Sequence, residues 1–186
     1  MSGVPEVLWR PAADARTNTD MGRWLSWLER ERGLRFDDYD AVWRWSTTEL
    51  GAFWESIWDY YDVRSATPYR AALSGAGIAD ARWFEGATLN FADHALRLPG
   101  RSEDDTVVVA DSQSRGSTSL TARELRWQVD RVRSGLSALG VGPGDRVAAY
   151  VSNIPEALVG FLATVGLGAV SYTHLTLPTT IKPWGG

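Results

Sequence analysis

Residues 120–170 read LTARELRWQVDRVRSGLSALGVGPGDRVAAYVSNIPEALVGFLATVGLGAV, and helix-like and strand-like patterns alternate along them. Thr121 and Glu124 have the spacing of a capping box, which marks the start of a helix. The helix should end at Gly140, because glycine is favoured just beyond a helix. Its apolar positions are Leu125, Val129, Val132, Leu136 and Leu139. One side of this helix is therefore predicted to pack on a core.

The second half of the stretch predicts a strand, a helix and another strand. The loop VGPGD leads into the strand RVAAYV, and Pro155 then occupies the first turn of a helix, where proline is tolerated. The next strand begins at residues 168–170. The apolar positions of the helix are Leu158, Phe161 and Leu162. Strand, helix, strand alternation at this spacing predicts βαβ units and a parallel sheet.

Two short runs precede this unit. TVVVAD, from Thr106, is rich in β-branched residues and is predicted to be a buried strand, and STSL, from Ser117, is a second short strand. The predicted fold class is α/β, with a helical, tryptophan-rich region ahead of the first βαβ units.

The tryptophans mark the first part of the chain as a different kind of structure, since eight of the ten lie between Trp9 and Trp83. One helix is predicted to end at Gly33, and a second to open at Ser46, which has capping-box spacing with Glu49. Met21, Trp24, Leu25 and Leu28 follow helical spacing in the first, and Leu50, Phe53, Trp54, Ile57, Trp58 and Tyr61 do so in the second. An aromatic stripe can stack against a ligand, but helical spacing favours a core or an interface.

Composition excludes several classes of function. The 186 residues are 44% hydrophobic and carry a net charge of -4, which provides no basic surface for nucleic acid or for an anionic membrane. There is no cysteine, which excludes disulfides, thiolate metal sites and a cysteine nucleophile. No signal peptide and no apolar run long enough to cross a bilayer is evident, so a cytoplasmic location is expected.

Three features invite a functional interpretation, and each has a simpler one. Glycines in GVGPGD can cradle phosphate, but these follow a helix and precede a strand, which predicts a turn. His94 adjoins Asp93, but neighbours on a helix do not face each other. The acidic clusters at residues 37–38 and 103–105 lack metal-ligand spacing and are predicted to be solvated turns or caps. The sequence therefore assigns no catalytic, cofactor-binding or metal-binding residue.

The segment RWFEGATLNFADHAL, residues 82–96, predicts a loop anchored by Trp83 and Phe84, turned by Gly86, and followed by a helix that starts at Asn90. In this order, ahead of residues 120–170, it resembles the N-terminal part of acyl-CoA synthetases of the adenylate-forming superfamily. The upstream segments VLWRP and DYDAVWRWSTTELGAFWESIWDYYDV are similar to those of acetoacetyl-CoA synthetases. The resemblance covers residues 7–170, and Glu85 departs from the proline that is more familiar after WF in that loop.

The resemblance implies a domain order and cofactors. Residues 1–105 would form the N-terminal helical region, and residues 106–170 the start of a truncated AMP-dependent synthetase domain. The family uses ATP, Mg²⁺ and CoA, with cationic groups on a phosphate loop that ends in lysine and a further lysine in a mobile C-terminal domain. None of these motifs is present, and residues 1–170 contain no lysine.

The C-terminal residues 171–186 have a different character and contain Lys182, the single lysine of the chain. A back-translation of residues 170–179 matches, in frame, the transposase-end adapter of sequencing libraries. These residues are therefore predicted to be a non-native tail rather than a divergent C-terminus, which leaves His174 and Lys182 without a functional role.

The leading hypothesis is a truncated acetoacetate–CoA ligase that is itself inactive and does not bind the family's cofactors well. Its partner in the full-length enzyme would be acetoacetate or another short acyl acid. An acetyl- or propionyl-CoA synthetase fragment, and a non-catalytic α/β interaction module that docks through its aromatic helix, are the alternatives. A sheet that ends early is expected to fold marginally.

Overall fold

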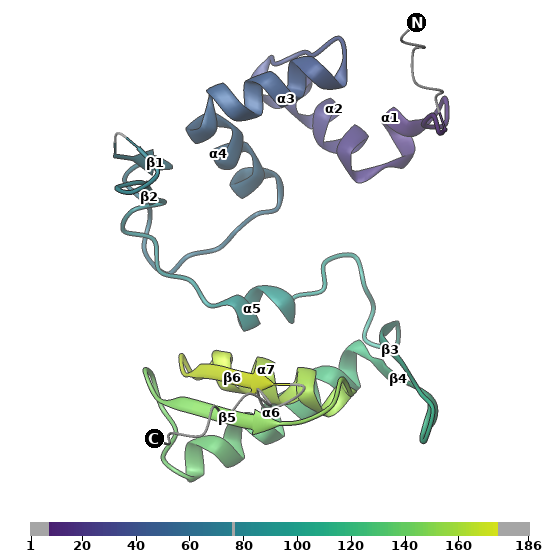
Figure 1. Ribbon diagram of the computed structural model, residues 1–186, viewed down its shortest axis with the longest axis vertical. Helices are drawn as coiled ribbons and strands as arrows, with labels where there is room; N and C mark the ends of the chain where they lie inside the picture. Colours follow the sequence, from purple (N-terminus) through teal and green to yellow (C-terminus); the bar gives the residue numbers. More distant parts are fainter. Residues whose placement is uncertain (1–7, 76, 175–186) are drawn as a thin grey trace, which may run out of the picture. The chain divides into compact units, whose positions relative to one another are not determined.

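The computed structural model describes residues 8–75 and 77–174 of the chain (Figure 1). It divides into two compact units, Met1–Thr88 and Leu89–Gly186, called unit 1 and unit 2 below. In the described part of the chain, no helix combines the length and the apolar character needed to cross a membrane.

Unit 1 is mainly helical. Its helices are α1 (Ala15–Asn18), α2 (Asp20–Arg32), α3 (Tyr39–Thr48) and α4 (Leu50–Tyr60), and a short antiparallel pair, β1 (Leu73–Ser74) and β2 (Arg82–Trp83), follows them. The α2 helix begins where the Thr19 hydroxyl accepts a 3.0 Å hydrogen bond from the Gly22 N–H, and it ends at Gly33 with φ +65°. The predicted end of this helix is thus confirmed.

The predicted start of the second helix at Ser46 is wrong. A helix, α3, already runs through Ser46, whose hydroxyl donates to the Trp43 carbonyl oxygen at 2.8 Å. The Asp38 carboxylate caps α3 by accepting from the Ala41 N–H at 2.8 Å, as expected for one of the acidic turns. Glu49 sits between α3 and α4 and makes no side-chain cap. Ser46 and Glu49 therefore match a capping pattern without forming a cap, because Ser46 lies inside α3 and Glu49 follows the last residue of α3; the cap of α3 is made by Asp38.

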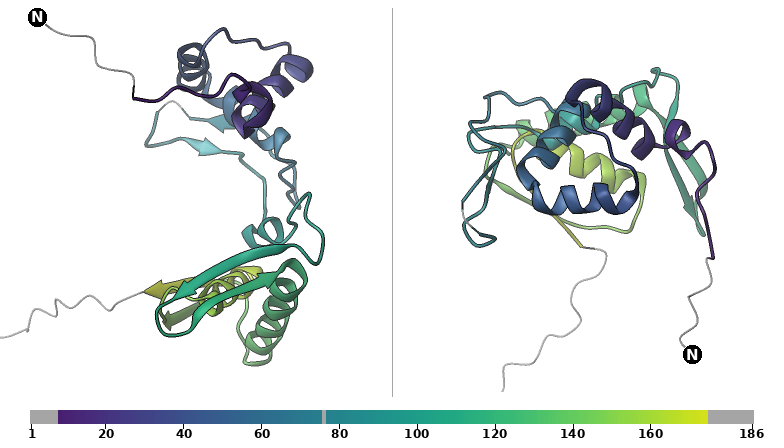
Figure 2. Two further views of the ribbon diagram at one scale, coloured as in Figure 1. Left: turned by 90° about the vertical axis from the view of Figure 1, so that its right-hand side faces the viewer. Right: turned by 90° about the horizontal axis from the view of Figure 1, so that it is seen from above.

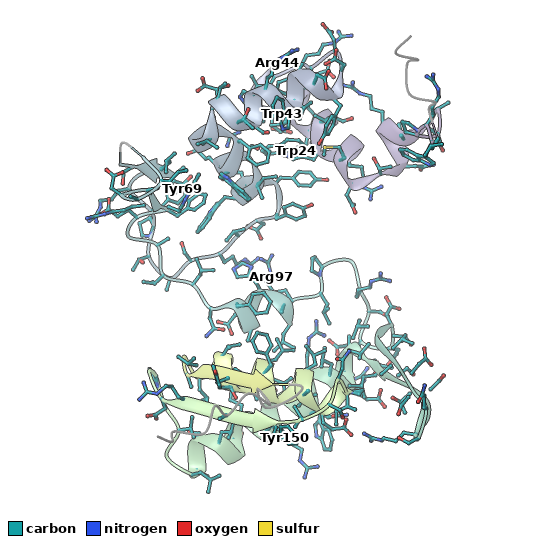
Figure 3. The ribbon with its side chains drawn as sticks, in the orientation of Figure 1. Trp24, Trp43, Arg44, Tyr69, Arg97 and Tyr150 are labelled. Carbon is teal, nitrogen blue, oxygen red and sulfur yellow. The ribbon has the colours of Figure 1, made fainter. Side chains whose placement is uncertain are left out.

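Aromatic rings fill the core of unit 1. Trp24, Leu28 and Val42 are buried, and the ring of Trp24 meets Phe53 edge-on with centroids 5.8 Å apart. Figure 3 shows Trp24 among the helices of this unit. The Trp24 Nε1–H is buried and has no hydrogen-bond partner. The aromatic face of α4 therefore contributes to a core, as its spacing favoured, although Trp54 stays partly exposed against Trp83.

Unit 2 is the α/β part of the chain. It comprises α5 (Phe91–Ala95), β3 (Thr106–Ser112), β4 (Gly116–Thr121), α6 (Ala122–Ala138), β5 (Arg146–Tyr150), α7 (Pro155–Gly166) and β6 (Val170–His174). The β3 and β4 strands form an antiparallel hairpin, whereas β5 and β6 pair in parallel with Arg146 opposite Val170. The predicted βαβ unit and the α/β fold class are confirmed.

The capping box of α6 is present as predicted. The Thr121 hydroxyl accepts from the Glu124 N–H at 3.2 Å, and the Glu124 carboxylate accepts from the Thr121 N–H at 2.8 Å. The Thr121 N–H and the Thr121 hydroxyl both donate to the Glu124 carboxylate, at 2.8 and 3.0 Å, and hold its pKa below its usual range because both hydrogen bonds favour the charged form. The start of α6 is thus set by sequence-local interactions.

Small aliphatic residues form the core of unit 2: Ala92, Leu125, Val129, Val159, Leu162 and Ala163. Asn90 links this core to the preceding loop, since its side chain caps α5 through the Ala92 N–H and also donates to the Val165 carbonyl oxygen at 2.7 Å. Ala92 and Asn90 fall in the region that the sequence placed with residues 1–105, and the domain boundary at residue 105 stays a prediction.

Two predicted burials are wrong. The β3 strand forms, but it is only partly buried, and Val109 is 71% exposed, because β3 pairs with one neighbour and one face of the hairpin is open. The far end of the α6 seam is also exposed, at Val132 and Leu139. The β6 strand includes Ser171 and continues to His174; residues 175–186 of the predicted tail lie outside the described residues. The pairing of β6 uses backbone groups, whatever side chains the residues carry, so it does not test whether residues 171–186 are native. The origin of the tail stays a prediction.

Candidate functional site

The carboxyl end of β5 is the place in unit 2 where ligands bind in other open parallel sheets. The chain leaves β5 at Tyr150 and enters α7 at Pro155, so the intervening loop lies at the start of a helix. A hollow of about 370 Å³ lies between this loop and β3. Its walls are Val108, Val109, Ala110 and Asp111 on one side and Asn153, Ile154, Pro155 and Leu158 on the other. Two side chains of this lining are polar, Asp111 and Asn153, and the others are apolar.

An ion pair joins the hairpin to α7 beside this hollow. The Arg115 guanidinium donates to both carboxylate oxygens of Glu156, at 2.7 and 3.2 Å. The hydrogen bond from Arg115 lowers the pKa of Glu156, and Glu156 in turn raises the pKa of Arg115. No sequence signal indicated this pair, because its members lie 41 residues apart.

A second, shallower groove of about 450 Å³ follows the surface of α6 and α7. The Arg131 guanidinium lies 4.5 Å from the centre of the Trp127 ring, which is within the range of a cation–π contact. The groove is otherwise lined mainly by Val132, Val159 and Gly160. Gln128 and Glu156 are the other polar residues of its lining.

The glycine-rich turn between α6 and β5 is used for structure, as predicted. The Gly142 N–H donates to the Asp145 carboxylate at 2.8 Å, and the Gly144 N–H donates to the Gly168 carbonyl oxygen at 3.0 Å. Gly140 and Gly144 both have positive φ, +89° and +86°, which glycine adopts without strain. Because these amides are engaged within the protein, the turn does not present them to a phosphate.

The remaining sequence features also have structural positions. His94 lies in the last turn of α5. Asp105 accepts hydrogen bonds from the Ser102 N–H and hydroxyl, at 3.0 and 2.7 Å, which lower its pKa. Glu85 lies in its predicted loop, where it pairs with Arg82 at 3.3 Å. Residues 8–75 and 77–174 contain no cluster of three or more potential metal ligands.

Two family models match the chain. A model described as AMP-binding enzyme matches residues 97–178, and one described as acetyl-coenzyme A synthetase N-terminus matches residues 39–95. The chain belongs to the AMP-binding enzyme family.

Relatives within the AMP-binding enzymes are similar along most of the chain. The acetoacetyl-coenzyme A synthetase of Rhizobium meliloti (strain 1021) is 37% identical over 163 residues, which are 88% of this chain and 25% of that protein. The malonamoyl-CoA synthetase vrtB of Penicillium aethiopicum is 36% identical over 173 residues, 90% of this chain and 24% of that protein. The chain thus spans about a quarter of the length of the curated relatives that it matches.

A solved structure supports the same relationship. The acetoacetyl-CoA synthetase from Streptomyces lividans is 38% identical and superimposes with a TM-score of 0.84 over 91% of this chain and 26% of that one. An identity of 38% supports a family relationship as well as a shared fold, and the match covers residues of both units. The resemblance stated from the sequence is therefore confirmed.

Proposed function

We propose that this chain is the N-terminal portion of an ATP- and CoA-dependent ligase that acts on acetoacetate. The observation that carries the proposal is the match to the acetoacetyl-CoA synthetase structure over 91% of the chain. In the complete enzyme, the acetoacetate carboxylate would attack the α-phosphorus of ATP and release pyrophosphate. The CoA thiol would then attack the acyl carbonyl, so that AMP leaves and acetoacetyl-CoA forms.

The described residues contribute scaffold to this reaction. Attack of a carboxylate on a polyphosphate needs cations that neutralise the charge of the transition state. The sequence has no lysine before Lys182, and the described part of the chain has no cluster of metal ligands. The described residues therefore bring together neither a lysine nor a metal-ligand cluster for Mg²⁺·ATP, and we assign no catalytic step to any of them.

The acyl substrate has a second candidate. The family model for residues 39–95 carries the name of acetyl-coenzyme A synthetases, which favours acetate or propionate as alternatives to acetoacetate. By the family resemblance, the acyl pocket that selects the substrate would lie downstream of residue 170. A cytoplasmic location and a small-molecule partner fit both candidates.

Two measurements test the proposal. Sequencing the gene past codon 170 from a library made without the transposase-end adapter should show an open frame that leads to a Ser/Thr/Gly-rich loop ending in lysine. The protein encoded by that frame should release pyrophosphate with acetoacetate and more slowly with acetate or propionate, whereas the 186-residue chain alone should release none. A stop codon near codon 186, or acetoacetate-dependent pyrophosphate from the short chain, would contradict the proposal.

A further inference from the structure

Figure 2 shows the two strands of the β3–β4 hairpin, and the packing of their side chains holds this hairpin to the rest of unit 2 unevenly along its length. Near its base, the side chains of Val107, Val108 and Leu120 pack against the aliphatic core. Beyond the base, residues 115–119 are all exposed, and Val109 projects into solvent. Packing therefore fixes the base of the hairpin and leaves its outer half without apolar support.

The tip of the hairpin is held by a charged contact. Arg115 is in the turn that joins Ser112 to Gly116, and its guanidinium reaches the first turn of α7 to grip Glu156 at 2.7 and 3.2 Å. Two parallel hydrogen bonds fix both the distance and the direction of the tip. Both side chains are about half exposed, 52% and 53%, so water competes for each partner. An exposed ion pair of this kind stabilises the closed position of the hairpin tip only weakly, so the contact favours that position and can still break.

The hollow of about 370 Å³ at the start of α7 lies under the hairpin. Its β3 wall, residues 108–111, belongs to the hairpin, whereas its other wall belongs to the β5–α7 loop and α7. Moving the outer hairpin about its packed base would shift Val109, Ala110 and Asp111 of this wall and leave Val108 and the other wall in place. Access to the hollow therefore depends on where the hairpin tip sits.

We propose that the β3–β4 hairpin is a strap over the hollow at the start of α7, and that the Arg115–Glu156 ion pair is its clasp. With the clasp made, β3 forms a wall of the hollow; with it broken, the outer hairpin swings on the base at Val107 and Leu120. The strap is a property of unit 2 itself and does not depend on the proposed ligase activity.

The absence of cysteine from the chain makes the strap directly measurable, since two introduced cysteines are the only labelling sites. Spin labels at Gln113→Cys, in the hairpin turn, and Ser134→Cys, on α6, report the position of the tip by pulsed electron spin resonance. The otherwise unchanged chain should give one narrow distance distribution. Arg115→Gln or Glu156→Gln should add a broad population, with an opening constant roughly two- to fivefold larger, the range expected for an exposed ion pair.

The double variant Arg115→Glu with Glu156→Arg should restore the narrow distribution, because it rebuilds the pair with its charges exchanged. Arg123→Gln is the matched control: it removes the exposed pair of Arg123 with Asp104, 3.2 Å apart near the base of the hairpin, and should leave the distribution unchanged. The proposal is overturned if both single variants keep the narrow distribution, or if Arg123→Gln broadens it equally.

Discussion

Unit 1 and unit 2 bury their apolar surface in different ways. Unit 1 packs a few large rings together: Trp24 and Trp45 both meet Phe53 edge to face and are tilted toward each other, with all three centroids within 6.2 Å of one another. Unit 2 packs small aliphatic residues of α5, α6 and α7 together and against the base of the β3–β4 hairpin. The stability of the aromatic core of unit 1 therefore depends on a few residues, whereas the stability of the aliphatic core of unit 2 is shared among many smaller contacts.

The parallel sheet of unit 2 leaves part of its surface uncovered. In the β5–β6 register, Val147 and Ser171 line a gap of about 130 Å³ beneath the helices, and the opposite face carries Ala148 and Tyr172. Tyr150 and Tyr172 are both exposed on that face, and Figure 3 marks Tyr150. Exposed apolar sheet faces and open edges favour association. Unit 1 is therefore expected to be the more self-sufficient of the two.

The largest expected effect is at the centre of the aromatic core. Trp24→Ala should destabilise unit 1 by about 3–5 kcal/mol, the range for deleting a buried indole. Hydrogen exchange followed by mass spectrometry should show lost protection in α2 and α4 with α6 unchanged. Trp43→Ala is the control, because Trp43 is 55% exposed on α3 and its loss should cost about 0.5 kcal/mol or less. Equal loss in α6 would show that the two cores are not separate.

Two helical glycines, one in each unit, differ in the space around them and so allow the two units to be compared by the same substitution. A Cβ at Gly22 would lie 2.3 Å from the Arg16 carbonyl oxygen, whereas one at Gly160 has nothing within 4 Å. Gly22→Ala should therefore destabilise unit 1 by about 1–3 kcal/mol, because the α1 backbone must move. Gly160→Ala should stabilise unit 2 by about 0.5–1 kcal/mol through helix propensity. Urea unfolding measures both, and shifts of the same sign would contradict the steric reason.

Asn90 tests how strongly one side chain organises unit 2. Asn90→Ala removes the α5 cap and the hydrogen bond to the Val165 carbonyl, and should cost about 1–2 kcal/mol. Asn90→Asp keeps an acceptor for the cap but loses the donor to Val165. In urea unfolding, Asp should recover only part of the loss. Full recovery would assign the whole effect to the cap.

The smallest effect is expected at high pH in unit 1. Partial burial, together with the 3.0 Å hydrogen bond that its hydroxyl donates to Glu55, raises the pKa of Tyr69 above 10.0. The contribution of Tyr69 to stability is therefore complete below pH 10 and is lost as the pH rises through the higher folded pKa. The difference between the ultraviolet titrations of the unchanged chain and Tyr69→Phe isolates this group. Glu55→Gln should shift its midpoint downward, and an unchanged midpoint would remove Glu55 as a cause.

Local patterns predicted the fold wherever local interactions set the structure. The Thr121–Glu124 box, the Gly33 terminus and the Asn90 start all depend on residues within one helical turn. The Ser46–Glu49 pattern failed because α3 already includes Ser46 and ends at Thr48, with Trp45 of the same helix packed against the core of unit 1. The exposure of β3 depends on which strands pair with it, which a β-branched run does not encode.

The candidate site was harder to predict for the same reason. The hollow is bounded by β3 and by the start of α7, and the clasp joins residues 41 positions apart. Neither has a local signature. The turn predicted at GVGPGD rested on the order helix then strand; the structure has this turn between α6 and β5, where the N–H groups of Gly142 and Gly144 donate within the protein.

The parallel pairing of β5 with β6 also has a consequence for synthesis on the ribosome. Arg146 pairs with Val170, 24 positions later (170 minus 146), so β5 emerges well before its partner exists. At about 5–20 residues per second, that interval lasts on the order of one to five seconds. Throughout it β5 lacks its parallel neighbour, and α6 and the emerging α7 are the helices that can cover its apolar side. During this interval the nascent chain presents one unpaired strand, β5, that a chaperone can protect. The interval ends when β6 has been synthesised and pairs with β5.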